Sequence, residues 1–294
     1  MQCAGKFYIF HPSRSDKFKI WGIGDLHMMS RAHHAHQLSR DLAVIKEDPF
    51  SFWFGMGDYC DFIGYADKRF DPDAVAEDVS IKDLGRLGAT GMERVKKAFD
   101  PIKKKCFGLI EGNHERKYAL HKDQQQLHGW LCTELDLPNF GYSVFFDIVF
   151  RRVTGIKTPR IERLSTTATA EGETRASGNE MTVRVFAHHG AGFATTPGGK
   201  LNKLIKVMHD FDADLYYMAH VHEPTAKPIS YLSADGKCEK LMARKKMGVI
   251  TGSYLLTYAQ DVTTYGEQKL YSPVETGARF ATIEPDKQRI KAEV

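Results

Sequence analysis

Seven short runs of mostly apolar residues recur along the chain, and they are rich in Ile, Val, Phe, Tyr and Trp. Short runs with this composition are typical of β-strands. The tail adds the pattern of a final strand with a polar end. The seven runs occupy residues 17–23, 51–56, 105–112, 142–150, 181–188, 214–220 and 247–255, and the tail occupies 277–294.

Between several of these runs, apolar residues recur every three or four positions, which is the period of an amphipathic helix. In the first such segment, Leu38, Leu42 and Ile45 follow one another at spacings of four and three. Strands that alternate with helices predict an α/β layered domain. The predicted helical segments are residues 30–48, the second half of 83–105 before Pro101, and 198–212.

Residues 151–180 break this pattern, because they are polar and rich in Thr, Gly and Arg. We interpret them as a loop or hairpin insertion. The chain shows no internal repeat and no linker with the composition of a domain boundary. Its 294 residues are enough for a large hydrophobic core. The sequence therefore predicts one domain over residues 1–294 with an insertion at 151–180.

The composition excludes some classes of protein and leaves others open. With 42% hydrophobic and 27% charged residues, the chain is not expected to be disordered. A net charge of +4 is too mild to indicate nucleic-acid binding by itself. The five cysteines are scattered and lack CxxC spacing, which predicts reduced thiols. The start lacks the apolar stretch of a signal peptide, and the most apolar window, 142–150, is too short to span a bilayer. We expect a cytoplasmic protein with no membrane contact.

Five of the apolar runs end in side chains that can bind metal ions. Residues i and i+2 of a strand share a face, so Asp-x-His and His-x-His can aim two side chains at one point. The carboxyl ends of strands in open α/β sheets form the crevice in which ligands bind. Imidazole, carboxylate and amide donors without thiolate favour ions such as Mn, Fe, Zn or Ni. The clusters are Asp25 with His27, Asp58 with Asp61, Asn113 with His114 and Glu115, His188 with His189, and His220 with His222.

The ordered motifs D-x-H, G-D-x-x-D, G-N-H-E, H-G and H-x-H resemble those of the calcineurin-like metallophosphoesterase superfamily, and they extend from Asp25 to His222. The resemblance implies an α/β fold: a four-layer α-β-β-α sandwich of two mixed β-sheets flanked by helices. One departure is visible. The last family motif is usually G-H-x-H, and here Ala219 replaces its glycine. Because a methyl group is small, we expect metal binding to persist, with at most a shifted backbone turn.

The resemblance also implies two metal sites that share one carboxylate. We expect manganese first, with Fe, Zn, Ni or Mg as alternatives. The implied ligands are Asp25, His27 and His222 for the first ion, Asn113, His189 and His220 for the second, and Asp58 as the bridge.

His114 would lie beside the scissile phosphate, as a general acid or as a stabiliser of developing charge. Asp61 is a candidate for orienting a ligand imidazole, and Glu115 for orienting His114. Arg116 would either meet a phosphate or be ordinary surface charge. His188 points away from the ligand side if the backbone is extended, so we interpret it as a structural residue near the site.

The implied reaction is hydrolysis of a phosphate ester by a metal-bridging hydroxide. Mild basicity and the expected insertion favour a phosphodiesterase acting on a nucleotide or nucleic acid. A phosphomonoesterase, including a protein phosphatase, remains open. A non-catalytic metal-binding scaffold of the same fold is the alternative from another class. The sequence does not indicate the oligomeric state.

Overall fold

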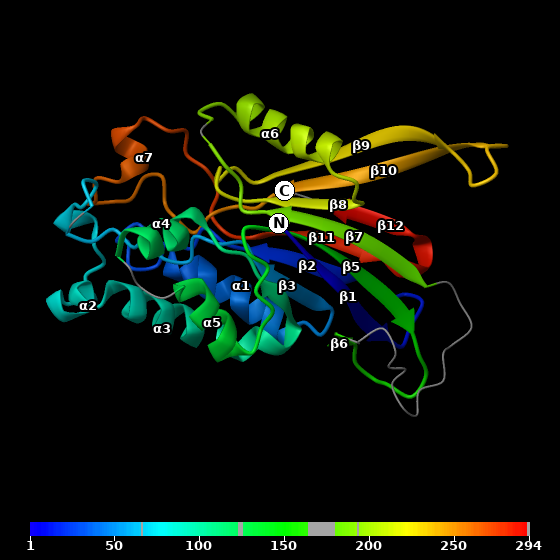
Figure 1. Cartoon of the computed structure of the whole chain (residues 1–294), viewed down its shortest axis with the longest axis horizontal. Helices are drawn as coiled ribbons and strands as arrows, with labels where there is room; N and C mark the ends of the chain where they lie inside the picture. Colours follow the sequence, from blue (N-terminus) through cyan, green and yellow to red (C-terminus); the bar gives the residue numbers. More distant parts are fainter. Residues whose placement is uncertain (66, 123–125, 164–179, 193, 293–294) are drawn as a thin grey trace.

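Two mixed β-sheets form the centre of the protein in this computed structural model (Figure 1). It describes residues 1–294 except 66, 123–125, 164–179, 193 and 293–294. The seven-stranded sheet runs β6 (Arg160–Glu162), β1 (Gln2–His11), β5 (Ser143–Arg152), β7 (Met181–His188), β8 (Leu215–Met218), β10 (Leu241–Ile250) and β9 (Thr225–Ala234). The five-stranded sheet runs β12 (Arg289–Ala292), β11 (Arg279–Glu284), β2 (Phe18–Ile23), β3 (Ser51–Gly55) and β4 (Cys106–Leu109).

Both sheets contribute to one shared core. Strands β2 and β3 are parallel and read as almost continuous apolar runs, as expected for strands covered on both faces. Phe52 and Phe54 of β3 belong to the same buried cluster as Ile148 of β5 and Val183 of β7. The two sheets therefore pack face to face.

Helices cover the outer face of each sheet. Against the five-stranded sheet, α1 (Ala35–Glu47) buries Leu38 and Ile45, and α3 (Leu87–Phe99) buries its own apolar face in the same cluster. On the seven-stranded sheet, α6 (Pro197–Asp210) packs Leu204 and Met208 against Phe186 of β7. The expected four-layer sandwich is confirmed. The remaining helices are α2 (Ile81–Gly85), α4 (Asn113–Lys122), α5 (Leu127–Leu135) and α7 (Tyr265–Gln268), and three 3-10 turns occupy Pro72–Ala74, Asp100–Lys105 and Pro285–Lys287.

Most predicted elements are present, and further elements accompany them. The run at 247–255 covers only the end of β10, which begins at Leu241. Strands β1 and β9 and helices α2, α4, α5 and α7 were not among the predicted elements. The predicted tail strand is divided into β11 and β12, with the Pro285–Lys287 turn between them.

Part of the expected insertion is built into the large sheet. Strand β5 continues to Arg152, and β6 pairs antiparallel with β1 through Tyr8 and Glu162. Residues 164–179 lie outside the described residues, so the insertion and the one-domain organisation stay predictions. All five cysteines are free, as predicted. Within the described part of the chain, no helix is both long enough and apolar enough to cross a membrane.

Candidate metal centre

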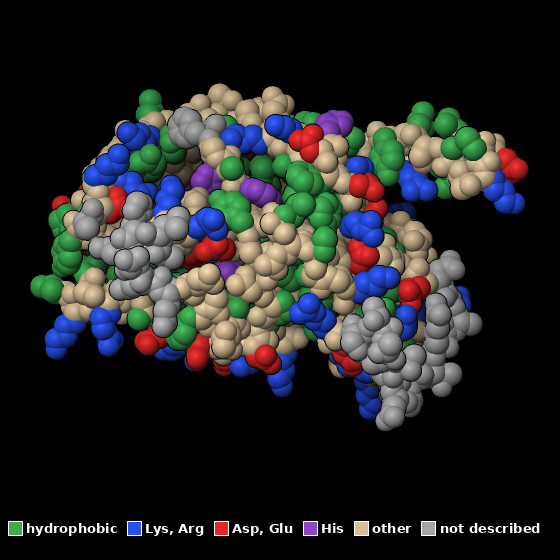
Figure 2. Space-filling model, in the orientation of Figure 1, with side chains coloured by type: hydrophobic (Ala, Val, Ile, Leu, Met, Phe, Trp, Pro, Cys, Tyr) green, Lys and Arg blue, Asp and Glu red, His purple; other side chains and the backbone are tan. Residues whose placement is uncertain are grey.

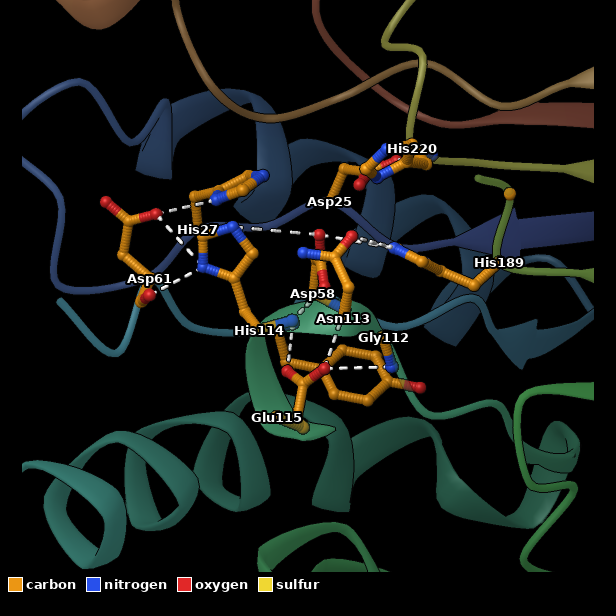
Figure 3. A network of polar contacts seen from close by, with 12 residues as sticks. Asp25, His27, Asp58, Asp61, Gly112, Asn113, His114, Glu115, His189 and His220 are labelled. Atoms are coloured by element: carbon orange, nitrogen blue, oxygen red, sulfur yellow. Dashed lines mark hydrogen bonds and ion pairs between the residues drawn. The ribbon is translucent and has the colours of Figure 1, made fainter. Parts of the chain in front are cut away.

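The predicted ligands gather where five strands of the two sheets end, a region that we call the metal edge (Figure 3). Asp25 and His27 follow β2, and Asp58 follows β3. Asn113 opens α4 soon after β4, while His189 and His220 come directly or shortly after β7 and β8. Ligands that are far apart in the sequence therefore come from neighbouring strand ends, as the carboxyl edge of an α/β sheet requires.

The first cluster consists of Asp25, His27 and His222, and their ligand atoms could hold one ion. The Nε2 atom of His222 lies 3.3 Å from Asp25 Oδ1 and 3.4 Å from His27 Nε2. Asp25 is fully buried, and although His222 Nε2 lies 3.3 Å away, its Oδ1 forms no well-aligned hydrogen bond with the described residues. A buried carboxylate oxygen without a donor is costly. A divalent cation at this point would satisfy it, so the donor set fits a metal ion.

The second cluster consists of Asp58, His189 and His220, with Asn113 beside it. His189 Nε2 lies 3.2 Å from both Asp58 Oδ2 and Asn113 Oδ1. The other nitrogen, Nδ1, donates to the Met56 carbonyl at 2.7 Å, which fixes the ring and turns Nε2 toward the carboxylate. His220 Nε2 donates to the Gly192 carbonyl at 3.1 Å, which leaves Nδ1 as its free acceptor.

The two clusters are joined through backbone contacts of the carboxylates. Asp25 Oδ2 accepts from the His220 amide at 2.8 Å, and Asp58 Oδ1 accepts from the His114 amide at 2.9 Å. The second oxygen of each carboxylate is left facing the imidazoles. Asp58 belongs to the second cluster, and its role as a bridge between two ions is a proposal.

Buried charges give this edge a strong field for cations. Burial would raise the pKa of Asp58, but the imidazoles of His189 and His114 outweigh burial and hold it well below its usual value. Burial opposes protonation of His189, but Asp58 raises its pKa to about 10. Protons and metal ions compete for the same atoms, so a site that binds protons this strongly is suited to a divalent ion.

The backbone of the ligand residues is held in an uncommon conformation. Asp25, His27, Asp58, His220 and His222 have φ values of 48°, 48°, 51°, 69° and 53°. Left-handed backbone is uncommon for residues other than glycine and costs about 1–3 kcal/mol at each position. Such strain persists only where the surrounding structure holds it. Its concentration in one cluster indicates a functional site.

The glycines near the site mainly allow two backbone segments to approach each other closely, and they contribute less to the turns of the chain. Gly57 has a φ of 88°, but the chain turns mainly at the ligand residues themselves. A Cβ atom on Gly112 would lie 2.1 Å from the Asp58 amide nitrogen. Ala219, at the position where the similar motif has glycine, is fully buried, and its φ is not positive. Its methyl group is therefore accommodated without backbone strain.

Asp61 holds two imidazoles in place. Its carboxylate accepts from His27 Nδ1 at 2.8 Å, as expected for a residue that orients a ligand, and its backbone carbonyl accepts from His114 Nδ1 at 2.6 Å. His114 Nε2 then faces Asp58 Oδ2 at 4.0 Å. Burial opposes protonation of His114, but Asp58 and Asp61 outweigh it and raise the pKa.

Glu115 does not orient His114, contrary to our expectation. Its buried carboxylate accepts from the amides of Gly112, Asp58 and Tyr59 at 2.9, 3.0 and 2.7 Å. Burial, together with the nearby Asp58 carboxylate, raises its pKa to about 7. Glu115 therefore connects the loop of Asp58 to the loop of Gly112. The Asp61 carbonyl, and not Glu115, orients the His114 ring.

The remaining predicted residues lie at the margin of the site. Arg116 is 60% exposed and pairs with Glu111 at 3.5 Å, which favours the surface-charge interpretation. His188 Nδ1 accepts from the Gly190 amide at 2.7 Å, and burial lowers its pKa to about 4. It is a neutral acceptor that supports the loop of His189, which is the structural role expected for it.

Two contacting residues were missed because no motif marks them. The Ser253 hydroxyl donates to the Asp25 carbonyl at 3.0 Å, at the end of β10. The Tyr142 hydroxyl donates to the Gly190 carbonyl at 3.1 Å, and its ring packs edge-on to His189. Tyr142 precedes β5 and Ser253 follows β10, both far in sequence from the residues that they contact, so only the tertiary structure reveals them.

A cleft of about 670 Å³ opens beside the two clusters. Figure 2 shows histidine side chains at the bottom of a hollow in the surface. Beyond the histidines, one wall comes from Ile63 and residues 68–74, and another comes from residues 255–274. The lining is mixed: Phe70, Leu255 and Tyr271 are among its apolar side chains, and Lys68 and Arg69 are among its charged ones.

Comparison with known proteins gives weak likenesses only. No family model matches the chain, and no curated protein matches it significantly. A Vps29 mutant from Entamoeba histolytica is 14% identical, with 94% of this chain and 97% of that chain covered at a TM-score of 0.39. Vps29 from Cryptosporidium parvum is 12% identical, with 94% and 96% covered at 0.37. A predicted phosphoesterase from Streptococcus pneumoniae is 11% identical, with 91% and 84% covered at 0.31. Likenesses at this level support no conclusion about the site.

Proposed function

We propose that this chain is a metallophosphoesterase of the calcineurin-like type that uses two divalent ions. One observation carries the proposal: side chains from five strand ends meet at a buried edge, and the buried Asp25 Oδ1 atom forms no well-aligned hydrogen bond with the described residues. Manganese is the ion we propose first, because the donors are imidazole, carboxylate and amide oxygen. The one-domain organisation and the cytoplasmic location remain part of this proposal, supported by the sequence pattern alone.

The proposed ligands divide into two groups with one shared member. Asp25, His27 and His222 would hold one ion, Asn113, His189 and His220 would hold the other, and Asp58 would contact both. When bound, the ions supply positive charge for the ester oxygens and lower the pKa of water. The protein's part is to hold the ligand atoms apart at fixed positions, through Asp61 on His27 and through the Met56 carbonyl on His189.

His114 is the proposed general acid. Its Nδ1 donates to the Asp61 carbonyl, so a second proton must be carried by Nε2, on the side of Asp58 and the cleft. The Asp58 and Asp61 carboxylates, which raise the pKa of His114, favour this protonated form. A proton delivered from Nε2 to the leaving oxygen typically contributes about 10²–10⁴-fold to the rate.

The cleft supports a phosphodiester substrate. Its volume of about 670 Å³ exceeds what a phosphate group needs, and apolar side chains such as Phe70 and Leu255 in its lining could contact an organic group beyond the metal edge. We infer a phosphodiesterase, with a nucleotide or nucleic acid as the first candidate substrate.

The test is turnover by manganese-loaded protein of bis-p-nitrophenyl phosphate and p-nitrophenyl phosphate, with metal content measured on the same sample. We expect hydrolysis of the diester that a chelator abolishes and added manganese restores. Turnover of the monoester alone would refute the diesterase assignment. Two bound ions without turnover of any phosphate ester would leave a metal-binding scaffold as the better description.

A further inference from the structure

The strands β9 and β10 form a two-stranded ribbon that projects from the body of the protein (Figure 1). β8 pairs with β10 only over Met247–Ile250, whereas β9 pairs with β10 from Leu241 to Ile250. Beyond β8, no third strand pairs with the ribbon among the residues that the structure describes. An isolated two-stranded ribbon is marginally stable in water, so a projecting one suggests a binding element.

The ribbon, defined as residues 225–250, has a net positive charge equal to that of the whole chain. It contains six basic and two acidic side chains, a net charge of +4, and the whole chain also has +4. The rest of the sequence is therefore neutral overall. Asp235 is engaged in the ribbon's turn, where it accepts from the Glu239 and Lys240 amides at 2.8 and 3.3 Å.

Most of the ribbon's cations have no carboxylate partner among the described residues. Only Lys246 lies near one, 3.9 Å from Asp212. Cations left unpaired on a projecting element are available to an external polyanion. The unpaired cations are Lys227, Lys237, Lys240, Arg244 and Lys245.

These cations lie on both faces of the ribbon. Arg244 is opposite Tyr231 and Lys245 is opposite Ser230 in the strand pairing, and consecutive residues of a strand point to opposite faces. A flat surface, such as an anionic membrane, would meet only one of the two. A groove with a phosphate backbone on each side would meet both. A second copy of the chain is disfavoured, because it would bring two ribbons of like charge together.

Groove geometry distinguishes between kinds of nucleic acid. The major groove of B-form DNA is about 12 Å wide and admits a two-stranded ribbon. The major groove of duplex RNA is too narrow for side chains to read. Leu232 and Leu241 are 67% and 75% exposed on the ribbon, where they could contact thymine methyl groups.

We propose that the β9–β10 ribbon binds double-stranded DNA in the major groove, at a site separate from the metal centre. Strand β10 ends next to Ser253, which contacts Asp25, and its ten residues at about 3.3 Å each place the tip about 30 Å away. The proposal concerns binding and does not depend on the proposed phosphoesterase function.

The test is fluorescence anisotropy of a labelled duplex DNA of about 20 base pairs, with the full chain in a chelator that prevents turnover. We expect the double variant Arg244→Ala with Lys245→Ala to bind about tenfold more weakly or worse at moderate salt. The slope of log affinity against log salt concentration should fall by about 1.8, because each phosphate contact contributes about 0.9. The variant Arg244→Lys with Lys245→Arg keeps both charges and should retain near-normal affinity.

The matched control removes two exposed cations elsewhere, Lys97→Ala with Lys104→Ala, for the same change in net charge. Affinity and salt slope should stay close to those of the unmodified protein, and the thermal midpoint of each variant checks that it is folded. An equal loss in both double variants would overturn the proposal. So would absence of duplex binding at about 50 mM salt, or binding of anionic phosphatidylserine vesicles in its place.

Discussion

The metal edge and the helical layer behind it each bury a histidine, and the two histidines behave in opposite ways. His189, at the metal edge, has a pKa of about 10, because Asp58 outweighs the effect of burial. His128, on α5, is nearly as buried, but burial dominates and lowers its pKa to about 4. Burial alone therefore makes an imidazole neutral. A buried carboxylate beside the imidazole instead favours the protonated, positively charged form of the same side chain.

The comparison also separates a proposed metal ligand from a structural histidine. His128 Nε2 donates to the Leu109 carbonyl at 3.1 Å, and no carboxylate faces it in the part of the chain that the structure describes. His189 likewise donates one nitrogen to a carbonyl, that of Met56, but its second nitrogen faces Asp58 and Asn113. The surroundings of the second ring nitrogen therefore distinguish a histidine that could bind a metal ion from one that only supports the fold.

The largest expected effect comes from removing the carboxylate that distinguishes the two regions. Asp58→Asn keeps the size of the side chain but takes away its charge. Losing a residue that merely supports a metal ligand costs about 10–100-fold in metal affinity or activity, so losing a proposed shared ligand should cost more than 100-fold. Metal content after dialysis and turnover of a phosphodiester measure the effect. Full retention of two ions would contradict the assignment of Asp58.

The second-largest expected effect concerns a third histidine, His114, which is assigned to neither metal binding nor structural support. His114→Ala should lower turnover by about 10²–10⁴-fold and leave metal content unchanged, because His114 is assigned to proton transfer and not to metal binding. A pH profile of turnover adds a second readout: the limb due to the acid should disappear in the variant. An unchanged rate would remove His114 from the mechanism.

A smaller effect concerns stability and acid. The pKa of His128 is lowered from its usual 6.5 to about 4 in the folded state, so the unfolded state binds the proton more readily. Stability is therefore full above about pH 6.5 and should fall by about 3 kcal/mol as the pH drops to about 4. Urea denaturation at several pH values would show this slope. The variant His128→Gln should show a shallower slope over the same range, and an equal slope would assign the acid sensitivity elsewhere.

The smallest effect tests the departure from the family motif. Ala219→Gly restores the usual glycine, but it removes a buried methyl group and adds backbone freedom. The expected cost is about 1–2 kcal/mol of stability, with metal content unchanged. The thermal midpoint measures this change. A clear gain in metal affinity would show that the alanine shifts the turn after all.

The metal edge could be predicted from the sequence because its ligands directly follow strands. A strand has a short-range pattern, and so does the motif after it: Asp25 and Asp58 needed only their neighbours to be recognised. The helix α4 was missed for the same reason, because it begins at Asn113, inside a motif interpreted as a strand end.

Other features depend on contacts that no local pattern encodes. Strand β9 contains Pro228 and lies at a sheet edge, where strand composition is weakest as a signal. Strand β1 is interrupted by a register shift between Cys3 and Lys6. The role of Glu115 depends on the amides of a loop more than fifty residues away. The cleft walls, Ile63 with 68–74 and residues 255–274, meet only in the folded protein.

The left-handed backbone of five proposed ligand residues has a consequence for redesign. Among residues with a side chain, Asn, Asp and His adopt this conformation most readily. The loops therefore accept an exchange of imidazole, carboxylate and amide at these positions with little backbone penalty, while Val, Ile or Thr would resist it. Exchanging Asn, Asp and His among these positions could therefore change which metal ions the site prefers, while the two sheets stay unchanged.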